Sequence, residues 1–189
     1  MNDWLLGALC ALGGYLIGSI SFAQIFAKVR GVNLREVGSG NPGATNAGRA
    51  MGRKMGVAVA LLDIAKGFIP AALAAWWFGD VFGVVAGAAA VLGHVTSPWL
   101  GFKGGKGVAT AGGVVLALRP LWAIPVLVVF AIVFALTKRV GLASVAGALM
   151  LIPSAIFLSK YPYDVFLAAF VAVLIAVRHS KNLQEFINR

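Results

Sequence analysis

The stretch MGVAVALLDIAKGFIPAALAAWWF, Met55–Phe78, decides the fold class because it is long and apolar enough to cross a lipid bilayer. An α-helix rises about 1.5 Å per residue and the hydrocarbon core of a bilayer is about 30 Å thick, so about 20 apolar residues suffice. The only charged residues in the stretch are Asp63 and Lys66, which lie three positions apart and therefore share one face of a helix. We predict a transmembrane helix with an internal ion pair.

Similar apolar runs fill most of the chain. Apolar residues make up 60% of its 189 residues, against about 45–50% in soluble domains. The charged residues are too few and too clustered to cover a soluble core. We therefore predict an all-α fold, a single domain over residues 1–189 that forms a polytopic integral membrane bundle of about seven transmembrane helices. The predicted spans are Trp4–Ala27, Met55–Phe78, Val81–Pro98, Gly107–Leu118, Leu121–Thr137, Gly141–Leu158 and Asp164–Val177.

The fourth predicted span, Gly107–Leu118, is the shortest. Twelve helical residues reach only about 18 Å. This segment is therefore either extended by the KGGK sequence before it or is a re-entrant half-helix. In other spans glycines recur at four-residue spacing, Gly14 with Gly18 and Gly83 with Gly87, which predicts close helix packing.

Basic residues are distributed unevenly between alternate loops, which predicts the orientation under the positive-inside rule. One set of loops holds only Arg119 and Lys160. The other set holds Lys28, Arg30, Arg35, Arg49, Arg53, Lys54, Lys103, Lys106, Lys138, Arg139, Arg178, Lys181 and Arg189. We expect the amino terminus outside the cell and the carboxyl terminus in the cytoplasm. The net charge of +10 then favours anionic lipid headgroups, and no nucleic-acid partner is expected.

The first polar stretch, VGSGNPGATNAGR (Val37–Arg49), follows the first span and is suited to binding phosphate. Glycines allow backbone N–H groups to converge on an anion, hydroxyl and amide groups add donors, and an arginine fork matches two phosphate oxygens. The G-x-G-x-x-G match within it is accidental, because no strand precedes it. A flexible connector is the alternative. The candidate residues are Ser39, Gly40, Asn41, Gly43, Thr45, Asn46 and Arg49.

The second polar stretch, FKGGKGVAT (Phe102–Thr110), precedes the short fourth span. Two lysines and the free N–H groups at a helix N-terminus make an anion site from few residues. The alternative is an interfacial anchor whose lysines extend toward lipid headgroups. The candidate phosphate-binding residues are Lys103, Gly104, Gly105, Lys106 and Gly107.

The third polar stretch, VRHSKN (Val177–Asn182), follows the last span. Helical spacing places His179 and Asn182 on one face, although a basic stop-transfer sequence is the simpler reading. With the predicted topology, all three polar stretches emerge on the cytoplasmic side. We therefore expect them to form one anion-binding pocket.

Two histidines and one cysteine are too few and too far apart for a metal site, so we expect neither a metal nor a cofactor. Asp63 and Lys66 are charged residues within a span, which marks them as functional candidates. We expect them to support the polar loops, with a proton relay as the alternative. His94 is either a structural residue or a second candidate base.

Taken together, these stretches resemble the bacterial acyl-phosphate-dependent glycerol-3-phosphate acyltransferases. The matching segments are GSGNPGATNAGR (Gly38–Arg49), DIAKG (Asp63–Gly67), GHVTSPWLGFKGGKGVAT (Gly93–Thr110) and RHSKN (Arg178–Asn182). The resemblance implies a multi-pass enzyme of the bacterial inner membrane whose active site faces the cytoplasm. Its substrates would be acyl phosphate and glycerol 3-phosphate, its products lysophosphatidic acid and phosphate. We expect a monomer.

The resemblance also implies residue roles. It makes Ser39, Arg49, His179 and Asn182 essential and Lys103–Gly107 a phosphate-binding loop. Either His179 or the phosphate of the donor accepts the glycerol proton, since an imidazole with a pKa of about 6.5 suits a general base. A small transporter or channel for an organic anion is the alternative function, and a lipid-binding assembly factor a third.

Overall fold

The computed structural model describes residues 2–188, and every regular element in that range is a helix. The prediction of an all-α fold is confirmed. The helices are α1 (Asp3–Ser19), α2 (Phe22–Val29), α3 (Ala44–Met51), α4 (Arg53–Phe78), α5 (Asp80–Val95), α6 (Val108–Leu118), α7 (Ala123–Thr137), α8 (Val140–Leu149), α9 (Leu151–Leu158), α10 (Tyr163–Arg178) and α11 (Ser180–Ile187), with short 3₁₀ turns at η1 (Pro98–Leu100) and η2 (Pro120–Trp122).

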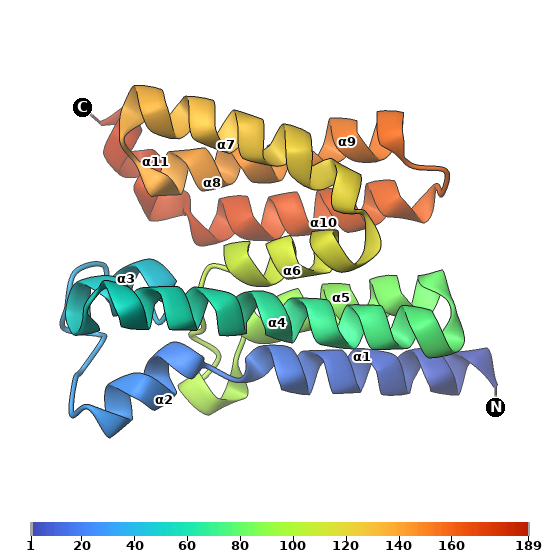
Figure 1. The fold of residues 1–189 in the computed structure, drawn as a ribbon, viewed down its shortest axis with the longest axis horizontal. Helices are drawn as coiled ribbons and strands as arrows, with labels where there is room; N and C mark the ends of the chain where they lie inside the picture. Colours follow the sequence, from blue (N-terminus) through green and yellow to red (C-terminus); the bar gives the residue numbers. More distant parts are fainter. Residues whose placement is uncertain (1, 189) are drawn as a thin grey trace.

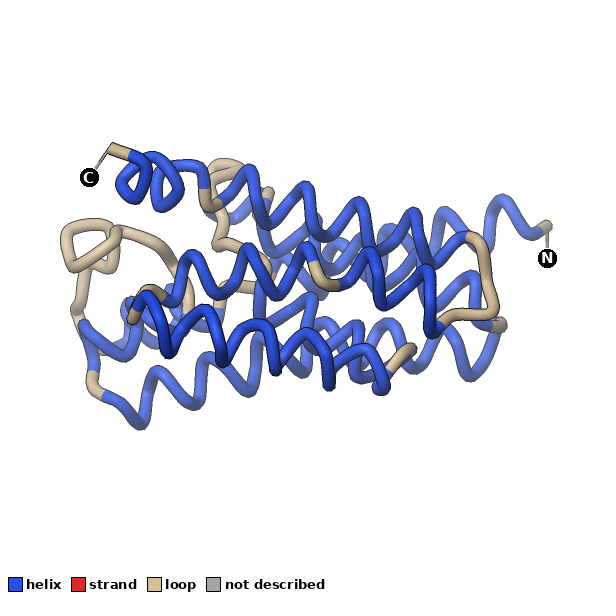
Figure 2. The backbone as a smooth tube through the Cα atoms, turned by 90° about the horizontal axis from the view of Figure 1, so that it is seen from above, coloured by secondary structure: helices blue, strands red, loops and turns tan. Residues whose placement is uncertain are grey.

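The helices form two halves that pack side by side (Figure 1). In the first half α5 packs on α1 and α4, and α6 packs on α4. In the second half α8 packs on α7 and α10, and α10 packs on α9. The halves meet where α10 contacts α5 and α6 contacts α7. Figure 2 shows that the long helices run roughly parallel to one another, as helices that cross a bilayer do.

Five helical segments are long and apolar enough to cross a membrane, namely Asp3–Val29, Arg53–Phe78, Asp80–Leu100, Pro120–Thr137 and Val140–Leu158. A sixth would combine α10 with α11, which are bent by 61°. The 11 residues of α6 are too few by the same measure, because the KGGK sequence before them is not helical. The number of crossings therefore stays a prediction.

The far end of α6 lies at the end of the bundle where α5 begins. Arg119, which follows α6, bonds to Asp80 at the start of α5, with Nη2 2.6 Å from Oδ2. The segment thus continues from the KGGK loop to the opposite end of the bundle.

Small residues bring α1 against α5, as the glycine spacing predicted. A Cβ atom on Gly14 would lie 2.2 Å from the carbonyl oxygen of Ala86, and one on Gly18 would lie 2.0 Å from that of Ala90. Any side chain at either position would push the two helices apart.

The first predicted span, Trp4–Ala27, is not one continuous helix. It breaks between α1 and α2, and the freed carbonyl groups are bonded by side chains from distant parts of the chain. Ser97 Oγ donates to the carbonyl of Ser19 at 2.7 Å, and Lys66 Nζ donates to that of Ile20 at 2.6 Å. Lys66 thus supplies a hydrogen bond to a carbonyl group that the break leaves without a helical partner. The spacing of residues in the sequence does not predict this role.

Candidate functional site

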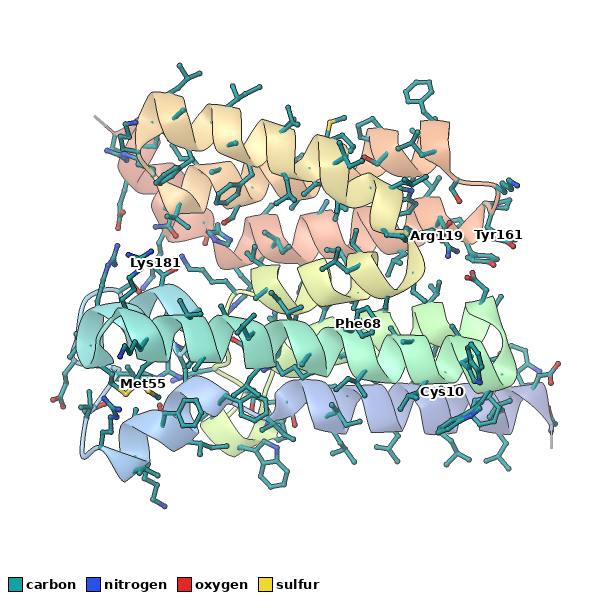
Figure 3. All side chains as sticks on the ribbon, in the orientation of Figure 1. Cys10, Met55, Phe68, Arg119, Tyr161 and Lys181 are labelled. Carbon is teal, nitrogen blue, oxygen red and sulfur yellow. The ribbon has the colours of Figure 1, made fainter. Side chains whose placement is uncertain are left out.

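A cavity of about 610 Å³ lies between the two halves at one end of the bundle. In Figure 3 this is the end of Lys181 and Met55, opposite Arg119 and Tyr161. All three polar stretches contribute to its lining. The predicted residues that line it are Ser39, Asn41, Gly43, Thr45, Asn46, Arg49, Asp63, His94, Lys106, Gly107, His179 and Asn182. The predicted residues that do not are Gly40, Lys66, Lys103, Gly104 and Gly105.

The first polar stretch reaches the cavity through α3 and the loop before it. Thr45 and Arg49 lie one helical turn apart on α3 and are exposed, as is Ser39 in the loop. Asn46 is buried and holds this loop, because its Oδ1 accepts from the N–H of Ser39 at 3.0 Å and its Nδ2 donates to the carbonyl of Leu34 at 3.1 Å. Asn46, which we expected to bind substrate, therefore positions Ser39.

The glycines of the second stretch support the loop. The N–H of Gly104 donates to the carbonyl of Val95, and the N–H of Gly105 donates to that of His94, each at 3.0 Å. Both glycines are buried. These two N–H groups were expected to hold phosphate, but the end of α5 already engages them.

Two arginines bind the carbonyl groups of the same loop. Arg178 at the end of α10 donates to Gly104 at 2.9 Å and to Gly105 at 3.3 Å. Arg35 donates to the carbonyl of Lys103 and so joins the first loop to the second. The two arginines hold the loop in one shape, and neither role was expected from the sequence.

Lys106 and Gly107 are the part of the second stretch that enters the cavity. Gly107 adopts a left-handed conformation with φ of 83° and precedes α6, whose first turn has no side-chain cap. Free N–H groups at a helix N-terminus attract an anion. Lys106 Nζ donates to Oδ1 of Asn182, joining the second stretch to the third. Burial lowers the pKa of Lys106 from its usual value; Glu185 opposes this shift, and the nearby Arg178 and Arg49 add to it.

The third stretch places a neutral imidazole in the cavity wall. His179 follows the last residue of α10 and is 3% exposed. Its Nδ1 lies 2.8 Å from the carbonyl oxygen of Ile175, which makes Nδ1 the donor and leaves Nε2 as an acceptor. Burial lowers the pKa of His179 to about 4. At neutral pH the side chain is therefore uncharged.

The charged residues of α4 lie beneath the loops. Asp63 and Lys66 form the predicted ion pair, with Nζ 2.9 Å from Oδ1, and both are buried. His94 Nδ1 lies 3.8 Å from Asp63 Oδ1 and has no hydrogen-bond partner among residues 2–188. A Cβ atom on Gly105 would lie 2.1 Å from His94 Nε2, so the ring packs directly against the loop. In the same range no cluster of three His, Cys, Asp or Glu residues suits a metal ion.

Comparisons with known proteins agree with this arrangement. The family described as glycerol-3-phosphate acyltransferase matches residues 8–189. The chain belongs to the glycerol-3-phosphate acyltransferase family. A relative of that name from Aquifex aeolicus is 46% identical over 92% of this chain and 91% of its own length, and one from Anaeromyxobacter sp. is 38% identical over 99% and 96%.

Two solved structures of PlsY (YgiH), an integral membrane glycerol 3-phosphate acyltransferase, have the same fold. The glycerol 3-phosphate form has a TM-score of 0.90 at 42% identity, and the lysophosphatidic acid form has a TM-score of 0.88 at 40% identity. Each match covers 96% of this chain and 92% of the other. Membership of an acyltransferase family does not support the transporter alternative.

Several lining residues of this family member were not expected from its sequence. Lys138 and Arg139, between α7 and α8, enter the sequence analysis only through the predicted orientation, and Glu185 of α11 has no predicted role. Ser144 of α8 and Phe130 of α7 lie within predicted lipid-crossing segments. A basic pair in a short turn on the predicted cytoplasmic side was the only signal available.

A second, apolar cavity of about 280 Å³ adjoins the first. Helices α6, α7 and α8 form most of its wall. The two cavities share Val108, Ala109, Phe130 and Ser144, so the polar cavity opens directly into the apolar one. Such a pair suits a molecule with an anionic head and a hydrocarbon chain.

Proposed function

We propose that this protein transfers a fatty acyl group from acyl phosphate to the 1-hydroxyl of sn-glycerol 3-phosphate, giving lysophosphatidic acid and inorganic phosphate. The observation that carries the proposal is the cationic cavity that opens into an apolar one. Family membership supports the acyl transfer, and the two PlsY forms support the acceptor and the product. The acyl-phosphate donor rests on the resemblance of the three polar stretches.

Arg49, Lys106 and the N-terminus of α6 are proposed to hold phosphate. None of the ion pairs in the described part of the chain involves Arg49 or Lys106, so both cations are free for an anion. Ser39 and Thr45 add hydroxyl donors beside Arg49. A hydrogen bond to a charged group contributes about 1.5–3 kcal/mol. A few such bonds offset the repulsion between two phosphate-bearing substrates.

The fatty chain of the donor is proposed to lie in the apolar cavity. Its wall contains glycines and alanines from facing helices, among them Gly112 and Gly147, which leave space between α6 and α8. The acyl carbonyl then lies at the junction near Val108 and Ser144. Lys106 and the first turn of α6 are near this point and would stabilise the oxyanion as it forms.

The reaction needs no covalent enzyme intermediate because acyl phosphate is a mixed anhydride. The oxygen of the 1-hydroxyl attacks the acyl carbon, the bond from that carbon to the phosphate oxygen breaks, and the hydroxyl proton leaves with the released phosphate. The neutral His179, whose Nε2 can accept a hydrogen bond, would orient the hydroxyl. A pKa of about 4 makes His179 a weak base. We therefore assign the proton to the phosphate and orientation to His179 and Asn182.

The site is proposed to face the cytoplasm of a bacterial inner membrane, as the positive-inside rule indicates. The protein is proposed to act as a monomer. A cysteine introduced at the exposed Ser39 should react with a membrane-impermeant thiol reagent only from the cytoplasmic side. Labelling from outside the cell would reverse the topology.

The proposal is tested with purified protein, acyl phosphate and glycerol 3-phosphate, by measuring phosphate release together with lysophosphatidic acid. Equal amounts of both products are expected. An acyl thioester is the comparison donor. Turnover with the thioester alone would disprove the assigned donor, and folded protein inactive with both donors would disprove the function.

A further inference from the structure

The apolar cavity has nearly the same depth along each of the helices that form most of its wall. On α6 the lining runs from Val108, at the polar cavity, to Leu116, which is eight residues or about 12 Å of helix. On α7 it runs from Phe130, again at the polar cavity, back to Ala123, which is seven residues or about 10.5 Å. The lining residues of α8 and α9 also span seven positions. The cavity is therefore about 10–12 Å deep.

The far end of the apolar cavity is closed by the 3₁₀ turn η2. This turn contacts α6, α7 and α9, so it lies where these walls meet. Its Trp122 is 2% exposed and belongs to the same buried cluster as Ala148 and Leu151, which line the cavity. In Figure 1, α6 and α7 leave η2 and separate toward the end of the bundle that holds the polar cavity. A straight chain that enters from the polar cavity therefore runs toward a closed end.

One side of the apolar cavity is open to the surface of the protein. Leu116 of α6 and Leu127 of α7 both line the cavity, and they are 45% and 62% exposed. The two helices leave this side open because α7 packs along α8 and makes much less contact with α6. In a bundle that crosses a bilayer, apolar side chains exposed at this depth face lipid. A chain can therefore leave the cavity sideways, between α6 and α7.

Glycines keep the middle of the apolar cavity free. Gly112 follows Val108 by four residues, which places it about 6 Å from the polar cavity. A Cβ atom on Gly112 would meet nothing within 4 Å. On the facing helix, a Cβ atom on Gly147 would already lie 3.4 Å from the carbonyl oxygen of Val126. A side chain at Gly112, or a branch on a bound chain at the same depth, would fill the remaining space.

These dimensions divide a long acyl chain into two parts. An extended carbon chain advances about 1.2 Å per bond, as an extended peptide does over its three bonds per residue. The cavity thus holds about nine or ten carbons. Later carbons pass into lipid, the environment that they occupied before binding, and they gain little from apolar burial because no surface leaves water. The earlier carbons lie between packed helices, where a change of shape causes a steric clash.

We propose that the enzyme selects its donor by the shape of the first nine or ten carbons of the acyl chain and does not measure the total chain length. This inference rests on the proposed function, which places the chain in the apolar cavity. Gly112 is then a specificity-determining residue. The selected substrate class is acyl phosphates that are unbranched near the carboxyl group, with any longer tail.

The first test compares donors that differ only in the position of one methyl branch. A methyl group on carbon 6 of hexadecanoyl phosphate lies about 6 Å along the chain, at the depth of Gly112, whereas one on carbon 14 lies in lipid. Relative to the straight chain, we expect kcat/KM to fall about 10-fold for the 6-methyl donor. It should change less than about twofold for the 14-methyl donor. The two isomers have the same composition, so they partition equally into detergent.

A second measurement varies length alone. Straight dodecanoyl and octadecanoyl phosphate both exceed the depth of the cavity. Their kcat/KM values at equal mole fraction in detergent should agree within about twofold.

A pair of variants tests the wall. Gly112→Leu should fold, because its Cβ atom meets nothing within 4 Å, and it should lower kcat/KM for hexadecanoyl phosphate about 10-fold without changing the KM for glycerol 3-phosphate. Gly13→Leu on α1 is the matched control, since an added Cβ atom there also meets nothing and Gly13 lines neither cavity. Unfolding temperatures in detergent check that both variants are folded.

Three results would overturn the inference while leaving the proposed function intact. One is an equal kcat/KM for the 6-methyl and 14-methyl donors. Another is a strong preference between dodecanoyl and octadecanoyl phosphate, which would mean that the cavity measures length. The third is wild-type activity in folded Gly112→Leu. The comparison of branched donors uses wild-type protein and does not depend on how the variant folds. Wild-type protein that transfers no acyl group from any of these donors would instead disprove the proposed function.

Discussion

The two ends of the bundle use arginine and lysine in opposite ways. At the end away from the cavity, Arg119 bonds to both oxygens of Asp80, at 2.8 and 2.6 Å, and to both oxygens of Asp164, at 2.6 and 2.9 Å. Tyr163 also donates to Asp80, at 2.7 Å. At the cavity end Arg49 and Lys106 have no carboxylate partner among the described residues.

This difference separates a structural cation from a binding cation. Arg119 joins the end of α6 to the starts of α5 and α10, and so links the two halves of the bundle (Figure 3). The neighbouring carboxylates raise the pKa of Arg119 above its usual value. An arginine already bonded to two carboxylates has little capacity for a substrate. Unpaired cations in a cavity retain that capacity, at some cost in stability from mutual repulsion.

The largest effect is expected at the paired end. Arg119→Ala leaves Asp164, which is 0% exposed, without its cation. Removing one partner of a buried pair costs about 3–5 kcal/mol. The unfolding temperature in detergent should fall, while kcat/KM of the protein that remains folded should not. Lys160→Ala, which removes an exposed cation near the same end, is the control. An unchanged unfolding temperature would remove the structural half of the comparison.

The next effect is expected at the cavity, where variants should lose activity and keep their stability. Arg49→Ala and Lys106→Ala should each lower kcat/KM about 10- to 100-fold, since a charge-assisted hydrogen bond contributes about 1.5–3 kcal/mol. Their unfolding temperatures should stay close to that of the wild type, because no described carboxylate loses a partner. A large loss of stability with normal activity would mean that these cations are structural.

A smaller effect tests the loop that carries Lys106. Gly105→Ala places a Cβ atom 2.1 Å from His94 Nε2, so the ring or the loop must move. Displacement of a catalytic group lowers the rate, and we expect a loss of about 10-fold in kcat. Gly13→Ala, whose added Cβ meets nothing within 4 Å, is the control. Equal activity in both variants would show that the loop tolerates the shift.

The smallest effect concerns pH: the loss of activity in a His179 variant should not depend on pH near neutrality. Burial lowers the pKa of His179 to about 4, so the side chain is neutral throughout pH 6 to 8. The ratio of kcat/KM between wild type and His179→Asn should therefore stay constant over that range, because substrate ionisation affects both proteins equally. It should begin to fall only near pH 5, as His179 gains a proton. A ratio that bends near pH 6.5 would indicate a normal pKa and a general base.

Local composition predicted much of the fold but not its details. The apolar runs anticipated the helical segments, because transfer of a segment into lipid depends on the sum of its side chains. The break between α1 and α2 was missed, since it depends on Ser97 and Lys66 reaching freed carbonyl groups. The short α6 was correctly singled out, but its course to Arg119 required the partner Asp80.

The candidate site was anticipated in a similar way. The three polar stretches were identified from residue types that bind anions, and they do line one cavity. Their individual roles were harder to predict. Asn46 and the N–H groups of Gly104 and Gly105 bond to the protein itself. A free donor and an engaged donor look the same in a sequence.

The sequence by itself determined that this protein is membrane-embedded and helical with three phosphate-suited stretches, because hydrophobicity, glycine freedom and charge are properties of neighbouring residues. Only the tertiary structure decided which cations are paired. Arg119 bonds to carboxylates 39 and 45 positions away in the chain, whereas Lys138 and Arg139 have none within reach. Hydrogen bonds act over about 3 Å, so their partners depend on the packing of distant helices.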